Sequence, residues 1–179
     1  MHPRFSYSHK DKNSSMVLLG VIAVVFMFAS PASSQTDKAQ VDRFKKEAAA
    51  LQAATDEAIN SATPGMGVLQ PAKATYLEGY GVVVTVEAAL VPNRNPFASP
   101  ISSADSRKMV AERRTQVRQK LEELIKQRAA ALSSVGAEES LAIILYLLNS
   151  NPADVPDLPA QMVFTAKKQN PTQVTVREF

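Results

Sequence analysis

The clearest pattern in the chain is an alternation of side chains from residue 76 to residue 92, "YLEGYGVVVTVEAALVP". Each even-numbered position from Tyr80 to Leu90 is apolar or aromatic, which is typical of a strand with one buried face. Pro92 cannot continue such a strand. The sequence therefore predicts one β-strand from Tyr76 to Pro92.

Glu78 is the exception to this pattern, because it shares the parity of the apolar positions. An isolated carboxylate on a buried face is very costly. Gly79 and Gly81 favour a bulge or a strand end, either of which would turn Glu78 towards solvent. In the alternative, Glu78 stays on the covered face and pairs with Arg114 or Arg118 from a helix.

Two long segments have helical periodicity. The first, Thr36 to Ser61, is rich in good helix formers and carries a thin apolar stripe. That stripe can dock on the domain, pair with another chain or belong to a stalk; it consists of Val41, Phe44, Ala48, Leu51, Ala58 and Ile59. The second segment, Ala104 to Leu132, has a clearer stripe with apolar residues at intervals of three and four, and Gly136 follows it.

The segments around these elements are harder to assign. Prolines and glycines between residues 63 and 73 predict an irregular linker. Leu141 to Leu148 is apolar on all sides, so both a helix and a buried strand fit it. We favour a helix from Ala137 to Leu148, because Glu138 and Glu139 suit a first helical turn.

The C-terminal part reads as a loop followed by a hairpin. Three prolines make residues 149–160 irregular, and residues 161–179 alternate on both sides of an Asn170-Pro171 turn. The sequence thus predicts a small α+β fold at 74–179, with about three antiparallel strands covered by helices. An amphipathic helix (35–62) and the linker (63–73) precede it.

The first 34 residues have the three parts of a secretory signal peptide. Arg4, Lys10 and Lys12 precede an apolar run from Met16 to Ala29, and small residues follow at the exit. We expect cleavage after Ser34, which would place the protein in the periplasm or the medium. The alternative is an uncleaved anchor in the inner membrane, and such a leader would be the only membrane contact.

The composition excludes several chemistries. The chain has no cysteine, and its two histidines, His2 and His9, both lie in the leader. A mature chain without thiol or imidazole cannot form a Ser-His-Asp or Cys-His centre or a His-ligated zinc site. We therefore expect no catalytic residues, metal or cofactor, and a protein that is not an enzyme.

The charge of the mature chain is also modest. The whole chain has 20 Lys and Arg against 17 Asp and Glu, but the leader holds three of the basic residues and one acidic residue. The rest has 17 against 16, a net charge of +1. This balance speaks against a nucleic-acid partner.

A few side chains remain as candidates for binding. Arg107, Arg114 and Arg118 lie within about 40° on the helical wheel and could hold an anion, or could simply cover the core with their stems. Tyr76, Glu78 and Tyr80 could join them. Asp154 and Asp157, with two asparagines, could offer oxygens to calcium, but their spacing favours capping of turns.

The stretch "YLEGYGVVVTVE" resembles a strand of uncharacterised exported bacterial proteins, which implies a cell-envelope setting and no particular activity. We expect a non-catalytic binding or assembly module of the envelope. It would bind a partner protein, or itself, through a sheet edge or the N-terminal helix. The alternative is a small ligand-binding or carboxylate-dependent hydrolytic domain that uses Glu78 and the helix arginines.

Overall fold

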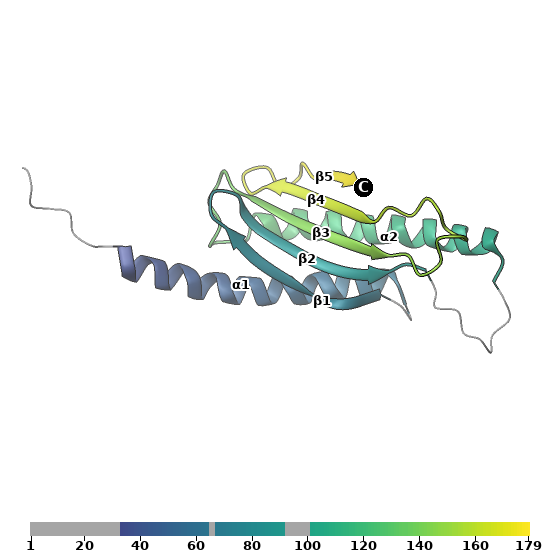
Figure 1. The fold of residues 1–179 in the computed structure, drawn as a ribbon. Helices are drawn as coiled ribbons and strands as arrows, with labels where there is room; N and C mark the ends of the chain where they lie inside the picture. Colours follow the sequence, from purple (N-terminus) through teal and green to yellow (C-terminus); the bar gives the residue numbers. More distant parts are fainter. Residues whose placement is uncertain (1–32, 65–66, 92–100) are drawn as a thin grey trace, which may run out of the picture.

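The computed structural model describes residues 33–64, 67–91 and 101–179, with side chains from residue 38 onward. In chain order the elements are α1 (Ser33–Ala62), β1 (Gly67–Leu77), β2 (Gly81–Ala89), α2 (Ser103–Ala129), β3 (Ser140–Leu148), β4 (Gln161–Lys167) and β5 (Thr175–Glu178). The strands form one sheet in the order β1-β2-β3-β4-β5, and both helices lie on the same side of it (Figure 1). The α+β class is confirmed, but the sheet has five strands instead of about three. Residues 1–32 of the predicted leader and most of the loop after Pro92 lie outside the described residues.

The sheet is mixed, not purely antiparallel as expected. β2 and β3 run parallel, whereas the other three neighbouring pairs are antiparallel. Parallel neighbours need a long connection that crosses over one face of the sheet, and α2 supplies it. The pairing of β2 with β3 therefore explains why α2 lies against the sheet.

The predicted strand from Tyr76 to Pro92 is in fact the end of one strand, a turn and a second strand. The Tyr80 N–H donates to the carbonyl oxygen of Leu77 over 3.0 Å, and Gly79 has a φ of 76°. A positive φ at the third position of a β-turn is easy for glycine. The alternation is confirmed from Val82 onward, where the even-numbered side chains are buried.

This turn explains Glu78. Glu78 follows the last residue of β1 and is exposed, so the strand-end explanation is confirmed. The pairing alternative is wrong, because Arg114 pairs with Glu178 and Arg118 pairs with Glu122.

The expected linker at 63–73 is also wrong, because β1 begins at Gly67. Pro71 is tolerated there because β1 is an edge strand and its pairing with β2 is irregular around this proline. The Ala72 N–H beside the irregularity donates to Asp56 Oδ1 over 2.9 Å, so α1 supplies a hydrogen-bond partner at this point. The prolines and glycines of this segment thus belong to an irregular edge strand and not to a linker.

The predicted helix at Ala137–Leu148 is instead strand β3. β3 is the middle strand of the sheet, and its Leu141, Ile143 and Leu145 are fully buried towards the helices. Ala142 and Ile144 on the opposite face are buried and half-buried, respectively. A strand with apolar residues on both faces has no period-2 signal, which is why its sequence resembled a buried helix.

Both predicted long helices and the C-terminal hairpin are confirmed. Of the three alternatives for α1, the structure shows docking: Leu51 and Ile59 are buried against the rest of the domain. Ser102 caps α2 by accepting from the Asp105 N–H over 3.1 Å. Among the described residues, neither helix combines the length and apolarity that crossing a membrane requires.

Two glycines of the β1–β2 turn should respond differently to substitution by alanine. A Cβ at Gly81 would lie 2.1 Å from the Ser140 carbonyl oxygen, whereas a Cβ at Gly79 would have no neighbour within 4 Å. We expect Gly79→Ala to cost about 1 kcal/mol through its positive φ alone, and Gly81→Ala to cost about 3 kcal/mol or more. Urea denaturation of both variants tests this order, and equal losses would contradict the register of β2 with β3.

Candidate functional site

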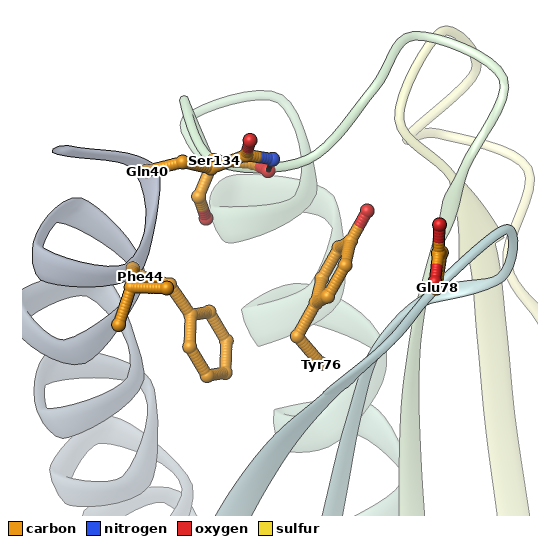
Figure 2. A pocket seen from close by; sticks show the side chains of 6 residues that line it. Gln40, Phe44, Tyr76, Glu78 and Ser134 are labelled. Atoms are coloured by element: carbon orange, nitrogen blue, oxygen red, sulfur yellow. Dashed lines mark hydrogen bonds between the residues drawn. The ribbon is translucent and has the colours of Figure 1, made fainter. Parts of the chain in front are cut away.

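An open groove of about 540 Å³ lies in the described part of the chain. It lies between the N-terminal half of α1, the end of β1 and the connection from α2 to β3 (Figure 2). Its lining consists of Gln40, Val41, Phe44, Tyr76, Glu78 and Ser134.

The wall of the groove is aromatic. Tyr76 lies on the face of β1 that α1 covers, and Phe44 meets it from α1 with ring centroids 5.9 Å apart and an interplanar angle of 60°. Such edge-to-face pairs are favourable beyond the area that they bury. Val41, one helical turn before Phe44, is 49% exposed. The apolar stripe of α1 therefore continues past the covered part of the helix into the groove.

The position of Tyr76 is fixed by Glu139. The Tyr76 hydroxyl donates to Glu139 Oε1 over 2.7 Å, and the Gly136 N–H donates to Glu139 Oε2 over 2.6 Å. These two hydrogen bonds, together with the Gly79 N–H and the charge of Lys168, outweigh burial and lower the pKa of Glu139. Glu139 is therefore ionised at neutral pH.

The hydrogen bond between Tyr76 and Glu139 also changes the pKa of the tyrosine. The hydrogen bond to Glu139 raises the pKa of Tyr76, and burial and the negative charges of Glu139 and Glu78 act in the same direction. Tyr76 therefore keeps its proton at neutral pH and serves as a hydrogen-bond donor with a fixed ring.

Glu47 attaches α1 to the α2–β3 connection. It accepts the Ser133 N–H over 2.7 Å and the Ser133 hydroxyl over 2.6 Å through one oxygen, and the N–H and hydroxyl of Ser134 through the other. Burial acts to raise the pKa of Glu47, but these hydrogen bonds outweigh it and the net pKa is lowered. Gln40 adds a bond of 3.4 Å from Nε2 to the Ser134 carbonyl.

Glu78 lies at the mouth of the groove. Its side chain is exposed at the β1–β2 turn, and Figure 2 shows it on the far side of Tyr76 from Phe44. Within the described part of the chain, no ion pair to Glu78 is found. The groove thus has an apolar side and a carboxylate side.

The sequence-predicted candidates are only partly brought together. Tyr76 and Glu78 share the groove, whereas Tyr80 is 40% exposed and is not part of its lining. The three arginines have other partners. Arg107 donates to the Ser103 carbonyl, and Arg114 and Arg118 pair with Glu178 and Glu122.

Sequence reasoning did not single out four of the lining residues for this site: Gln40, Val41, Phe44 and Ser134. A signal was present in the stripe of α1, whose first two members, Val41 and Phe44, line the groove. Ser134 could not be found in the same way, because its contact with α1 is a long-range tertiary contact that the sequence pattern does not show.

The proline loop after β3 shows turn capping. Asn149 Nδ2 donates to the Val155 carbonyl over 2.7 Å, and Asn149 Oδ1 accepts the Asn151 N–H over 3.1 Å. Asp154 accepts from Ser103 and Asn151. In the described ranges, no cluster of three Asp, Glu, His or Cys side chains is placed to hold a metal ion.

No protein-family model, curated protein or solved structure matches this chain. We therefore infer a function from the geometry of the groove.

Replacement of Glu47 by glutamine should make stability less dependent on pH. A carboxylate whose folded pKa is lowered stabilises the fold above its unfolded pKa, and this contribution is lost as pH falls through the folded pKa. We expect Glu47→Gln to cost about 1–2 kcal/mol at pH 7 and distinctly less at pH 3. Urea denaturation at both pH values measures this, with exposed Glu57→Gln on the same helix as the control. An equal cost at the two pH values would contradict the hydrogen-bonding role of the ionised carboxylate.

Proposed function

We propose that this chain is an exported, non-catalytic binding module of the bacterial cell envelope. It binds a partner protein by accepting an apolar side chain of that partner into the groove. The observation that carries this proposal is the aromatic and aliphatic lining of the open groove, in which Val41 is exposed and Phe44 and Tyr76 are half-buried.

The groove is organised before any ligand arrives. Tyr76 is held by Glu139, and α1 is held beside it by the bonds of Glu47 to Ser133 and Ser134. Because these side chains are already held in place, less conformational entropy is lost when a ligand binds. An apolar wall with a few polar groups at its rim is also the usual construction of a ligand site.

The partner is better sought in another protein than in a second copy of this chain. Self-association through α1 would use its apolar stripe, but Ala48, Leu51 and Ile59 of that stripe are buried in their own domain. Only Val41 remains substantially exposed, which leaves too little apolar area for a helix–helix dimer.

Chemical considerations support binding rather than hydrolysis. Glu47 and Glu139 have lowered pKa values, so neither holds a proton to donate at neutral pH. Of the arginines that the hydrolytic alternative would use, Arg114 and Arg118 pair with carboxylates of β5 and α2. Arg107 donates to the Ser103 carbonyl oxygen. A small-molecule ligand in the same groove is the remaining alternative.

An apolar probe should bind in the groove. We expect millimolar N-acetyl-leucine amide to produce saturable amide shifts in ¹H–¹⁵N NMR spectra at residues 40–44 and 76–78, and none at 146–148. Val41→Asp should weaken these shifts at least threefold, because it places a charge on the apolar wall. Leu148→Asp, an exposed residue at the end of β3, is the matched control. Shifts that ignore Val41→Asp, or that centre on residues 146–148, would refute the site.

Export gives a separate prediction. In cells that express the full chain, we expect mass spectrometry of the soluble envelope fraction to find a protein that begins at Gln35. An N-terminus at Met1 in the membrane fraction would favour the anchored alternative. An intact chain in the cytoplasm would refute the envelope assignment.

A further inference from the structure

We propose that the partner segment that occupies the groove is basic: an arginine or lysine next to an apolar residue, with its charged group held at Glu78. This inference rests on the proposed function and specifies the chemistry of its ligand. It follows from the charges of the groove, the state of Tyr76 and the arrangement of the walls.

The carboxylates around the groove are balanced mainly by neutral donors. Glu47 is held by backbone and hydroxyl groups of Ser133 and Ser134. Glu139 is held by the Tyr76 hydroxyl and the Gly136 N–H. Neutral donors stabilise a negative charge without cancelling it. The charges of Glu139 and Glu78 both act on Tyr76, so Glu139 adds to the negative potential of Glu78 at this end of the groove.

Lys168 cancels only part of this potential. Its charge acts on Glu139, and its Nζ donates to the Val135 carbonyl over 2.6 Å, which holds it at the α2–β3 connection. Glu78 still has no cation partner in the described part of the chain. Glu78 is the charged side chain that lines the groove, so a ligand cation would meet this carboxylate.

The tyrosine strengthens the preference for a cation. Tyr76 donates its hydroxyl proton to ionised Glu139, and a hydrogen bond to an anion increases the electron density of the phenol ring. A ring of this kind attracts a guanidinium or ammonium group above its face. The carboxylate of Glu78 and the ring of Tyr76 thus act on the same ligand charge.

The order of the walls suits a short peptide segment. Figure 2 shows Tyr76 between Phe44 and Glu78, so the apolar and charged ends of the groove are separated by one aromatic ring. A peptide with an apolar residue beside a basic residue can meet both ends while its backbone stays outside the open groove. An acidic or phosphorylated segment would instead be repelled by Glu78, so the expected ligand charge is opposite to that of the anion site that the sequence suggested.

Three peptides test the inference: Ac-Gly-Leu-Arg-Gly-NH₂, its citrulline analogue and its glutamate analogue. Citrulline has nearly the shape of arginine but no charge, so the first two isolate the charge. We expect the arginine peptide to bind about fivefold more tightly than the citrulline peptide, the size of an exposed ion pair, and the glutamate peptide to bind most weakly. Affinities come from the amide shifts of residues 40–44 and 76–78 at low salt.

Two variants distinguish the effect of the Glu78 carboxylate on peptide affinity from that of other surface charges. Glu78→Gln should remove most of the difference in affinity between the arginine and citrulline peptides. Glu87→Gln, on the exposed face of β2, is the matched control and should leave both affinities unchanged. At 0.5 M salt the preference should shrink in the unsubstituted protein, because exposed charges are screened.

The outcomes distinguish this inference from the proposed function. Equal binding of the three peptides in the groove, or an arginine preference that survives Glu78→Gln, would overturn the basic ligand and leave the groove as a binding site. No shift at residues 40–44 and 76–78 with any peptide would overturn both. Tighter binding of free guanidinium than of the arginine peptide would replace the peptide segment with a small cation.

Discussion

The structure depends on the parallel pairing of β2 with β3. Gly81 lies opposite Ser140, and the Ser140 N–H donates to the Tyr80 carbonyl over 2.7 Å, so the β1–β2 turn and the start of β3 are held together. Because the strands are parallel, the chain between them must cross the sheet, and it does so as α2. The crossover returns the segment just before β3 to the same end of the sheet as the turn.

The groove is a consequence of this return. Gly136 and Glu139 lie in the returning segment, and Tyr76 lies at the end of the strand before the turn, so the hydroxyl of Tyr76 meets a carboxylate 63 positions away. The docking of α1 then adds Phe44 as the third side. Each wall of the site therefore comes from a different part of the chain.

The sequence predicted the elements with a clear period and missed those without one. The stripe of α2 and the alternation after Val82 have one buried and one exposed side, which produces a readable pattern. β3 lies at the centre of the sheet and is apolar on both faces, so it resembled a helix. β1 contains Pro71 and resembled a linker, because an edge strand tolerates interruptions that a central strand does not. Glu78 was found because it interrupts a row of apolar positions, and Tyr76 because it belongs to the same row. Ser134 reaches the site only through tertiary contacts.

The most direct test is an intermolecular NOE experiment on the complex with the arginine peptide. The account predicts contacts from the leucine methyl groups of the peptide to the rings of Phe44 and Tyr76. It also predicts contacts from the arginine side chain to the ring of Tyr76 and the methylene protons of Glu78. NOEs instead to Tyr146, Leu148 and Phe179, the exposed apolar residues on β3 and at the C-terminus, would contradict it and move the binding surface away from the groove.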